Sequence, residues 1–585
     1  MKKGFLPLGF LTLLISGVAA LFFISASSDD ATIKNSNDQS IVKAKEWLVT
    51  VRNNQNTGLL DPRDVLNARK QANEASYKSA DGGDLNWVEM GPSNMGGRTR
   101  ALIVDNRDES AKTLYAAGVN GGIFKTTNLG AIWEKVNTSN GTANLNVSCM
   151  IQTSDGTIYV GTGEAFNNQD YSGLGEMGFV SGFVGQGIFK SDGNDNFTLV
   201  EGTEPAANNE TVEWAFVNEI AMASNGNLWA ATNTGLKVKT SSGWMYAQFT
   251  DTLGVALDLM GIARDVEVHS NGLVVAAVDG LGYASSDGSP SGFVTFSLGE
   301  EDNLPAEGIG RLQLAIAPSD ENIVYAMAAK SSNNALENVY LSEDKGRTWR
   351  IIGPGGSESL NILGTEDYYQ GDYNNVLEVF PNDPYHILAG GVNVWEGFKV
   401  DETGFYSWGE RSISNVLNSG GILSPVFVHA DHHVYAFRPG TNEFFLGTDG
   451  GVYKGSIGSS FFTFQVLNKN YNVTQFYTVD VSNKLDEAFG GSQDNGTIFI
   501  GGSNELPMPG ADLWNYGNEL FPEGSDGGYC AISTIRKYET IGGVTPPPIF
   551  YSKSPLPNEE ALTDRMRRSQ SMAFDYSSTF LKSGM

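Results

Sequence analysis

The stretch ALIVDNRDESAKTLYAAGVNGGIFKTTNLGAIW, which runs from Ala101 to Trp133, decides the fold because the chain repeats its pattern. An apolar strand is followed by a polar turn, a second apolar strand, a Gly-Gly turn, an aromatic residue and a further polar turn. Degraded copies of this pattern begin at Leu314, Leu377, Tyr435 and Val479. Each copy contains two or three short strands, which cannot bury their own apolar faces. Repetition at about 40–60 residues therefore predicts the blades of a β-propeller.

The composition fits a protein made of short strands and many turns. Of 585 residues, 70 are glycine, about 12% against a usual ~7%. Asp and Glu number 67 against 38 Lys and Arg, so the net charge is −29. Such a surface repels phosphate backbones and anionic membranes, which argues against nucleic acid as a partner. Cys149 and Cys530 are the only cysteines, too few for a disulfide-stabilised scaffold.

The N-terminus is typical of an export signal. Lys2 and Lys3 precede an apolar run from Phe5 to Ile24, and small residues follow it. The run is long enough that an uncleaved membrane anchor is the alternative. We expect the chain to be secreted or displayed at the cell surface, with that anchor as its one contact with a membrane. The expected organisation is a signal peptide or anchor over 1–27, a spacer and a pair of helices over 28–84, propeller repeats over 85–549, and a tail over 550–585 that could start a further blade.

Paired apolar strands recur along the propeller region and set the expected number of blades. They lie near Thr99–Val104, Ile158–Gly161, Leu228–Ala231, Leu273–Val278, Ile323–Ala328, His386–Ala389, Phe444–Gly447 and Glu487–Gly490. We therefore expect roughly eight or nine blade-like units. One large ring and two seven-bladed rings, the second incomplete at the C-terminus, both fit this all-β pattern.

The segment LSEDKGRTWRII over Leu341–Ile352 contains the strongest local motif. Its Ser342, Asp344, Gly346 and Trp349 have the spacing of an Asp-box (BNR) turn. In such a turn the Asp side chain accepts backbone N–H groups, Gly adopts the left-handed conformation and Trp packs against the blade. We interpret the motif as a marker of the fold and not as a catalytic site. Weaker copies lie at Thr127–Trp133 and Ser286–Gly288.

Asp-box turns combined with Gly-Gly-aromatic turns resemble sortilin-type and xyloglucanase-type β-propellers. The chain is similar above all to exported bacterial glycosyl hydrolase-like or sortilin-like repeat proteins, which are abundant in Bacteroidota. The resemblance spans about Ile41–Ser533 and is implied by the motifs at Trp87–Pro92, Gly96–Arg98, Gly118–Asn128, Gly447–Gly455, Gly490–Thr497 and Gly524–Gly528. It implies a propeller fold and export, whereas a fold alone does not fix an activity.

Inverting enzymes of the xyloglucanase type suggest candidate catalytic carboxylates. They use two Asp residues from Asp-x-Gly-Gly-like turns, one as acid and one as base, about 6.5–9.5 Å apart across a cleft. Asp449 keeps this pattern in Thr448–Gly451, but Asn120 stands at the matching place in the first turn, and an amide cannot act as a base. Asp494 and Asp526 lie in similar turns. The resemblance therefore implies Asp449, Asp494 and Asp526 as catalytic candidates; the alternative is that each Asp only caps its own turn.

Three of the five histidines lie in VHADHHVYAF over Val428–Phe437. If this segment is a strand, His429, Asp431 and His433 point to one face and His432 to the other. These residue types can bind a transition metal. We therefore take His429, Asp431 and His433 as candidate ligands and a divalent metal as the candidate cofactor. A polar network between blades, or direct contact with a ligand, is the alternative.

A glycine-rich insertion, EAFNNQDYSGLGEMGFVSGFVGQG over Glu164–Gly187, interrupts one blade. Aromatic side chains stack on sugars or hold peptides, and loops on a rigid scaffold often carry function. A compact loop that packs on itself is the alternative. The candidate ligand-binding residues are Glu164, Phe166, Tyr171, Phe179 and Phe183, together with Arg98.

These observations lead to three hypotheses about function. The first is an exported propeller that binds a polysaccharide or a surface protein through one face of the ring. The second is an inverting glycoside hydrolase that acts on a β-linked polysaccharide. The third is a structural component of a surface or secretion assembly. Two carboxylates in unlike environments across one cleft would favour the hydrolase, and a broad exposed apolar patch would favour the assembly.

Overall fold

The computed structural model of this protein describes most of the chain between residues 91 and 501. Within that region the described part omits 137–143, 165–184, 207–211, 300–302, 356–359, 365–368, 416–423, 459–460 and 482–486. Beyond it the structure describes Gln71, Asn515–Tyr516, Tyr529–Ser533 and Ile549–Lys553. The expected helical pair, apart from Gln71, therefore lies outside the described residues, as do the N-terminal apolar run, Asp526 and the four aromatic residues of the insertion.

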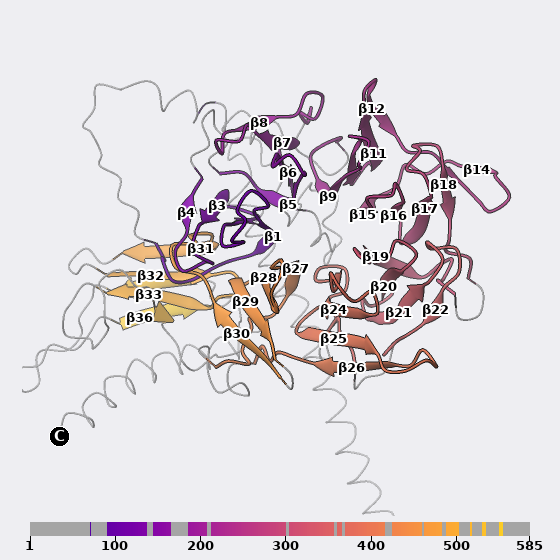
Figure 1. The fold of residues 1–585 in the computed structure, drawn as a ribbon. Helices are drawn as coiled ribbons and strands as arrows, with labels where there is room; N and C mark the ends of the chain where they lie inside the picture. The colour runs from indigo at the N-terminus through magenta and orange to yellow at the C-terminus, as the bar shows by residue number, and fades with distance from the viewer. Residues whose placement is uncertain are drawn as a thin grey trace, which may run out of the picture. The chain divides into compact units, whose positions relative to one another are not determined.

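Seven β-sheets, each built from consecutive strands, form a ring of seven blades (Figure 1). The first strand of each blade is innermost, because it contacts the first strand of the next blade. Blades 1 and 2 comprise β1 (Thr99–Val104), β2 (Leu114–Gly118), β3 (Ile123–Thr126), β4 (Glu134–Lys135), β5 (Val147–Gln152), β6 (Ile158–Thr162), β7 (Ile188–Ser191) and β8 (Phe197–Leu199). Blades 3 and 4 comprise β9 (Val217–Met222), β10 (Leu228–Thr232), β11 (Gly235–Thr240), β12 (Gly243–Tyr246), β15 (Ala263–Val268), β16 (Val274–Val278), β17 (Leu281–Ser285) and β18 (Phe293–Thr295), with β13 (Phe249–Thr250) and β14 (Ala256–Leu257) added to the edge of blade 4.

The remaining three blades follow the same order from the centre outward. Blades 5 to 7 comprise β19 (Ile309–Ile316), β20 (Val324–Lys330), β21 (Leu336–Ser342), β22 (Arg350–Ile351), β23 (Val376–Val379), β24 (His386–Gly390), β25 (Val394–Lys399), β26 (Tyr406–Glu410), β27 (His432–Phe437), β28 (Glu443–Thr448), β29 (Gly451–Ile457) and β30 (Phe462–Val466). An eighth sheet contains β31 (Phe476–Val481), β32 (Glu487–Ser492), β33 (Thr497–Gly501) and β34 (Asn515–Tyr516). The pair β35 (Tyr529–Ser533) and β36 (Ile549–Lys553) belongs to a separate compact unit.

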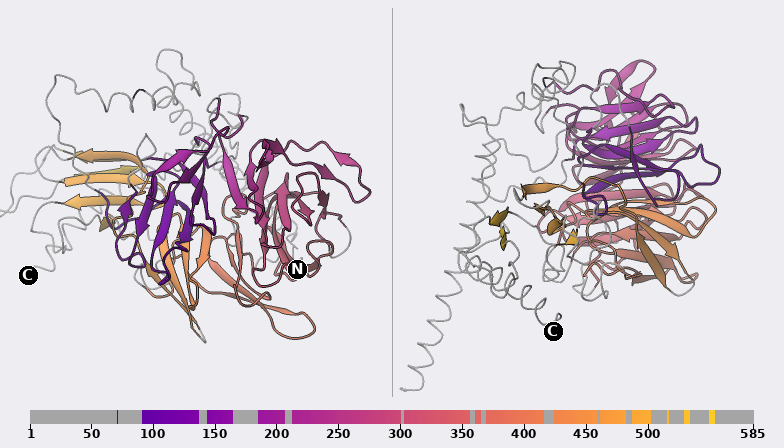
Figure 2. Two further views of the ribbon diagram at one scale, coloured as in Figure 1. Left: turned by 45° about the horizontal axis from the view of Figure 1, so that its top comes forward. Right: turned by 90° about the vertical axis from the view of Figure 1, so that its left-hand side faces the viewer.

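The eight apolar strand pairs expected from the sequence each fall in a different sheet. Seven of them belong to the ring and the last, at Glu487–Gly490, belongs to the eighth sheet, which lies outside the ring (Figure 2). The all-β propeller expectation is therefore confirmed as a seven-bladed ring. The alternative of one large ring with eight or nine blades was wrong, because blade 7 packs directly on blade 1.

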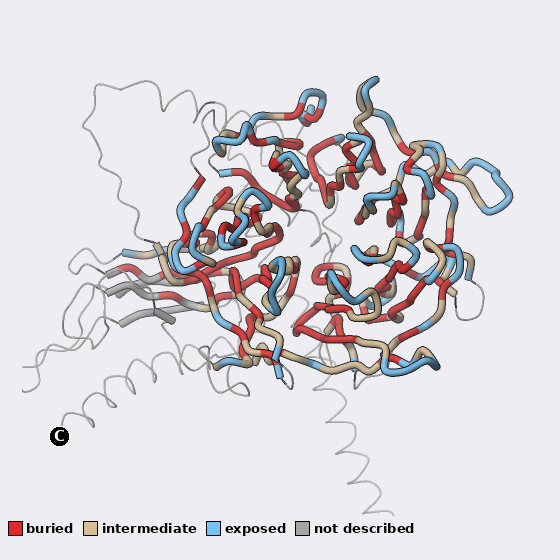
Figure 3. Tube along the Cα trace, viewed as in Figure 1, coloured by how far each residue is buried: buried red, intermediate tan, exposed pale blue. Residues whose placement is uncertain are grey.

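Apolar clusters between neighbouring blades hold the ring together. Seven clusters of buried residues each join one successive pair of blades, including blades 7 and 1. The middle strands supply much of this core: β10 and β16 are buried along their whole length. Their sequences, LWAAT and VVAAV, are apolar on both faces, as expected for strands that are covered on both sides. Figure 3 shows this buried layer inside exposed hairpin tips.

In the described part of the chain, the ring closes without exchanging a strand between its two ends. Trp133 of blade 1 donates from Nε1 to the carbonyl of Leu467, which follows blade 7, at 2.6 Å. Tyr471 packs against the rings of Trp133 and Phe124, with centroids 5.4 and 5.1 Å apart. The hydroxyl of Thr99 donates to the Tyr471 hydroxyl at 3.1 Å. Side-chain packing and these hydrogen bonds therefore join blade 7 to blade 1.

Two glycines bring the start of blade 1 against blade 7. A Cβ on Gly96 would lie 2.4 Å from the Cα of Gly451, and one on Gly97 would lie 2.3 Å from the carbonyl oxygen of Val473. Any other residue would have to move the backbone at these positions. The Gly-Gly-Arg sequence therefore places Arg98 directly beside the turn that contains Asp449.

Two further features bear on the expectations from the sequence. No helix long and apolar enough to span a membrane occurs in the part of the chain that the structure describes. Cys149 is a free, buried thiol in the cluster between blades 2 and 3.

Candidate functional site

A β-bulge recurs where the inner strands begin, and it defines one face of the ring. In six of the seven inner strands the pairing skips a single residue near the first position. The skipped residues are Arg100, Ser148, Asn218, Arg264, Gly310 and His433. Bulges redirect side chains and occur often beside active sites. We call this side of the ring, at which the inner strands begin, the Arg98 face.

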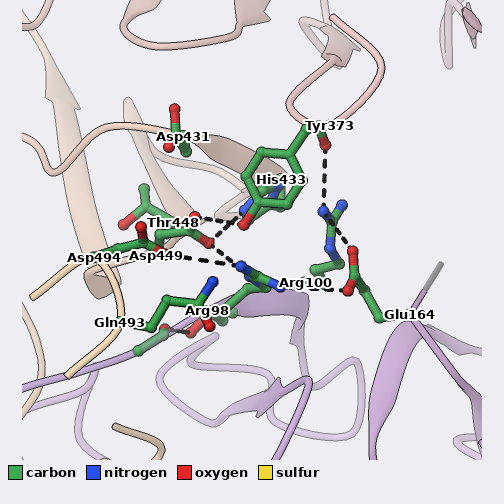
Figure 4. Close-up of polar contacts among 12 residues, drawn as sticks. Arg98, Arg100, Glu164, Tyr373, Asp431, His433, Thr448, Asp449, Gln493 and Asp494 are labelled. Carbon is green, nitrogen blue, oxygen red and sulfur yellow. Dashed lines mark hydrogen bonds and ion pairs between the residues drawn. The ribbon is translucent and has the colours of Figure 1, made fainter. Parts of the chain in front are cut away.

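Arg98 is the centre of a buried charged group on this face (Figure 4). Its Nε donates to Asp449 Oδ1 at 3.3 Å, and its Nη1 donates to Glu164 Oε2 at 3.4 Å. Its Nη2 lies 3.7 Å from Asp494 Oδ2. Arg98 is only 2% exposed. We call these contacts, together with those of Arg100, Tyr373 and His433 described below, the Arg98 network.

Glu164 fixes the root of the insertion within the Arg98 network. It lies two residues after the end of β6 and is fully buried. Arg100 Nη2 lies 3.0 Å from Glu164 Oε1, while Arg98 binds the other carboxylate oxygen. Burial opposes ionisation, but the charges of Arg100 and Arg98 outweigh it and lower the pKa of Glu164. Glu164 is therefore a carboxylate held by two guanidinium groups.

Tyr373 and His433 hold the other end of the Arg98 network. His433 Nε2 lies 2.8 Å from Asp449 Oδ1, and the Tyr373 hydroxyl donates to Asp449 Oδ2. Burial, followed by the charge of Arg100, lowers the pKa of His433 to about 4, so at neutral pH the ring is uncharged and donates. The rings of Tyr373 and His433 meet edge to face, and the guanidinium of Arg98 lies 4.9 Å from the Tyr373 centroid.

Asp449 and Asp431 lie in one site but in opposite electrostatic surroundings. Burial disfavours the charge of Asp449, but Arg98 and the hydrogen bonds of His433 and Tyr373 outweigh it and hold its pKa well below the usual range. Burial, followed by the charge of Asp449, raises the pKa of Asp431 to about 7. The backbone N–H of Asp449 donates to the Asp431 carbonyl at 3.2 Å, so the residues are adjacent.

Asp431 is held by amide groups that the sequence did not single out. Asn374 Nδ2 and Gln370 Nε2 donate to Asp431 Oδ1 at 2.7 and 3.1 Å. Both amides come from the segment before β23. Asp431 itself has φ of +66°, a left-handed backbone conformation that is uncommon for residues other than glycine. The local turn therefore turns this carboxyl toward blade 6.

Each of the three proposed metal ligands contacts a different partner in the structure. The strand begins at His432, so His429 and Asp431 precede it and the expected alternation of faces does not apply to them. His429 Nε2 lies 2.9 Å from the carbonyl of Asp494, Asp431 is bound by two amides, and His433 binds Asp449. Among the described residues, no group of three or more His, Cys, Asp or Glu side chains is arranged to hold a metal ion.

Two of the three proposed catalytic carboxylates meet at this site. Asp449 is 1% exposed, and its side chain is fully engaged by Arg98, His433 and Tyr373. Asp494 lies in the turn between β32 and β33, and its side chain is 28% exposed. Asp526 lies outside the described residues, as do Phe166, Tyr171, Phe179 and Phe183. Arg98 and Glu164, proposed as ligand contacts, are buried and hold the site together.

The opposite ends of the inner strands carry a separate hollow. It has a volume of about 620 Å³ and lies between the first hairpins of blades 6 and 7. Phe380 and Phe437 contribute its aromatic lining, together with Arg438 and Asn442. None of the catalytic, ligand-binding or metal-binding candidates from the sequence lies in it.

Comparisons with known proteins were made for the whole chain. No model of a protein family matches it, and no curated protein matches it. Solved structures with a similar fold include an ancestral GH74 enzyme, with a TM-score of 0.48 and 16% identity over 71% of this chain and 54% of that one. The GH74 xyloglucanase from Xanthomonas campestris matches with a TM-score of 0.47 and 12% identity over 76% of this chain and 71% of that one.

A third similar structure is an extracellular domain from B. thetaiotaomicron that is assigned to a hybrid two-component system. Its TM-score is 0.40, with 14% identity over 70% of this chain and 45% of that one. The match to the ancestral GH74 enzyme spans about half of that enzyme's length. At these identities and TM-scores, the likenesses carry no argument about activity or ligand.

Proposed function

We propose that this protein is an exported β-propeller that binds a glycan through the Arg98 face. The observation that supports this most is the convergence of separate loops and turns on Arg98. Glu164 follows the second strand of blade 2, Asp449 lies in a turn of blade 7, and Asp494 lies in a turn of the eighth sheet. Binding residues are often carried by loops that a rigid scaffold positions.

The buried and exposed parts of this face have different tasks. Arg98, Glu164 and Asp449 are almost fully buried, so they fix the surrounding loops. Asp494 is partly exposed. The aromatic-rich insertion leaves the blade at Glu164, so its root is tied to the same group of charges. Aromatic rings and carboxylates are side chains that bind sugars by stacking and by hydrogen bonds.

A second candidate function is glycoside hydrolysis, which one observation favours. Asp431 has a pKa raised to about 7, whereas Asp449 is held as a carboxylate. A general acid and a general base in one site are typically two carboxyl groups whose pKa values are shifted in opposite directions. In that case Asp431, and not Asp449, would donate the proton. The complete engagement of Asp449 by three partners makes binding without cleavage our first proposal.

The test is a binding and cleavage assay on a panel of plant, algal and microbial polysaccharides. Retained protein and new reducing ends are measured together for the full chain. We expect retention on at least one polysaccharide, and at least about tenfold weaker binding for Asp494→Asn, which keeps the turn geometry. The matched control is Asn382→Ala, an exposed residue in the hollow at the other end of the blades.

Each outcome of this assay separates the hypotheses. Retention that Asp494→Asn weakens and Asn382→Ala does not supports the Arg98 face as the glycan site. New reducing ends that disappear in Asp431→Asn would establish the hydrolase instead. Equal loss in both variants, or no retention on any polysaccharide, would contradict glycan binding and move the proposal to a protein partner.

A further inference from the structure

The hollow at the opposite ends of the inner strands belongs neither to the Arg98 network nor to the proposed glycan site. It has a volume of about 620 Å³ and lies between the first hairpins of blades 6 and 7. Ligand sites in proteins span about 300–1,000 Å³, so the hollow has the size of a binding site. Its lining shows which kind of ligand it fits.

Half-buried apolar side chains form the wall of the hollow. The ring centroids of Phe380 and Phe437 lie 4.7 Å apart, and the ring of His386 stacks on Phe380 at 3.6 Å. Ile457 adds an aliphatic side chain to the same lining. Because packed neighbours already hold these side chains, an apolar group can bind without the cost of ordering the wall.

The apolar surface continues beyond the hollow onto the outer hairpin of blade 7. Phe461 is 68% exposed, and its carbonyl accepts the backbone N–H of Gly458, which lines the hollow. Asn442 also lines the hollow and is exposed, and an amide side chain can both donate to and accept from a peptide group. Exposed apolar surface that continues into a hollow is typical of an interaction site. A peptide segment can contact the hollow and Phe461 together.

Arg438 is the one cation among the lining residues that the structure describes, and it is bound by acceptors of the protein itself. Its Nη1 donates to the carboxylate of Glu443. Its Nε and Nη2 donate to the carbonyls of Ala111 and Ser110, at 2.9 and 3.1 Å. Since all three guanidinium nitrogens have partners, Arg438 is a poor site for an anionic ligand.

Asp383 gives the hollow a negative charge that no cation balances. It lines the hollow and is exposed, and its Oδ1 accepts the backbone N–H of Tyr385 at 3.0 Å. In the part of the chain that the structure describes, Asp383 forms no ion pair. A ligand group placed beside this carboxylate is therefore favoured if it is positive.

The hairpin turns around the hollow carry the same sign of charge. At this end of blades 6, 7 and 1 they contain six acidic and three basic residues, over 105–113, 127–132, 380–385, 400–405, 438–442 and 457–461. The net charge of the whole chain, −29, also attracts cations at long range. An apolar hollow with an acidic rim therefore complements a ligand that is both apolar and basic.

We propose that the hollow binds a basic segment of a partner protein, in which an apolar side chain enters the hollow and a neighbouring Lys or Arg pairs with Asp383. This site is separate from the proposed glycan site, which lies at the other end of the inner strands. Burial of the apolar side chain supplies most of the affinity. Asp383 and the acidic turns supply specificity, because they repel an acidic segment of the same shape.

The test begins with a library of acetylated hexapeptides that contains every residue type at each position, which is screened on the full chain. We expect the retained peptides to be enriched at least about threefold in Lys or Arg beside an apolar residue and depleted in Asp and Glu. The most enriched peptide is then compared by isothermal titration calorimetry with its analogue that has norleucine in place of the basic residue. The analogue should bind about fivefold more weakly, as expected for an exposed ion pair.

Three variants separate the charge from the hollow. Asp383→Asn keeps the oxygen that accepts the Tyr385 N–H, so it should stay folded and bind the two peptides equally. Asn442→Trp places a large ring in the hollow and should weaken both peptides at least about tenfold. Asp401→Asn is the matched control, because Asp401 is an exposed carboxylate of the next hairpin outside the lining, and this variant should bind as the wild type does.

Thermal melts of the three variants establish that each is folded. A library result without enrichment of basic residues would overturn the inference. A preference for the basic peptide that survives in folded Asp383→Asn would overturn it as well, and so would full binding by Asn442→Trp, because the peptide would then bind elsewhere. Equal weakening by Asp383→Asn and Asp401→Asn would reduce the effect to the net charge of the protein and contradict the assigned ion pair.

Discussion

Arg98 and Asp449 are 351 residues apart in the sequence, yet their side chains form a buried hydrogen-bonded ion pair at 3.3 Å. The pair joins the start of blade 1 to blade 7 at the point where the ring closes. It also joins the residues that anchor the insertion and the eighth sheet, since Arg98 contacts Glu164 and Asp494 as well. Closure of the fold and construction of the candidate site therefore depend on the same side chain.

The first prediction concerns the stability that this pair provides. Arg98→Met should lower the free energy of unfolding by about 3–5 kcal/mol, because it leaves the buried carboxylates of Asp449 and Glu164 without their shared cation. Urea unfolding of the full chain measures this. The double variant Arg98→Met with Asp449→Asn should recover part of the loss. A change of less than about 0.5 kcal/mol in the single variant would show that the pair does not stabilise the closed ring.

The second prediction concerns the apolar part of the closure. Trp133→Ala should lower the free energy of unfolding by about 3–5 kcal/mol, because it opens a cavity beside Tyr471 and leaves the Leu467 carbonyl without its hydrogen bond from Trp133. The matched control is Met245→Ala, an exposed apolar residue on β12. Urea unfolding of both variants measures the two changes in the free energy of unfolding. Equal, small effects would mean that the contact between blades 7 and 1 is not needed to hold the ring.

The third prediction concerns the turn at Ser342–Trp349. Asp344 accepts the backbone N–H groups of Arg347 and Thr348 at 3.0 and 2.8 Å. Asp344→Ala should therefore destabilise the protein by about 1–2 kcal/mol. Ligand binding by the folded variant should not change, because the turn lies on an outer hairpin of blade 5. A loss of binding without a loss of stability would assign this turn a functional role.

The fourth prediction concerns pH and the inner strands of blades 3 and 6. Burial, and then the charge of Asp265, raises the pKa of Glu219 on β9 and Glu378 on β23 to about 8. In an unfolded chain glutamate titrates near 4.3. Between these values the folded state binds more protons, so stability present at pH 5 is lost as the pH rises to 8.

Glutamine substitution tests this dependence. Glu219→Gln should reduce the loss of stability between pH 5 and pH 8 by on the order of 2 kcal/mol, since the amide does not titrate. It should also make the protein more stable than the wild type at pH 8. Urea unfolding at both pH values provides the measurement, with the exposed Glu402→Gln as the control. Parallel pH profiles for wild type and Glu219→Gln would show that this carboxyl is not held protonated.

The repeat pattern predicted the blades well because it is carried by the apolar second strands, such as Leu228–Thr232 and Val274–Val278, which are fully buried. It could not predict how many blades the ring contains. The outer strands are too short to leave a sequence signal, as β4 and β22 show with two residues each. The eighth repeat has the same local pattern as the others, and it lies outside the ring because blade 7 packs on blade 1 through contacts such as that of Trp133 with Tyr471.

The candidate site was predictable only in part. Asp449 was identified because it lies in a Gly-Gly turn, which the chain repeats. Glu164 was identified because it begins the insertion that interrupts one blade. Tyr373 has no motif around it, and its role depends on contacts with residues of blades 1 and 7. Arg100 and Arg264 acquire their positions from β-bulges, which depend on strand pairing and leave no mark in the sequence.

The most direct test of the account is amide hydrogen exchange with and without a bound oligosaccharide from the polysaccharide panel. The account predicts protection on the Arg98 face, at 370–375, 429–433 and 491–496, with no change at 380–383 and 437–442 around the opposite hollow. Protection of the hollow, with the Arg98 face unchanged, would contradict the proposal that this face is the binding site.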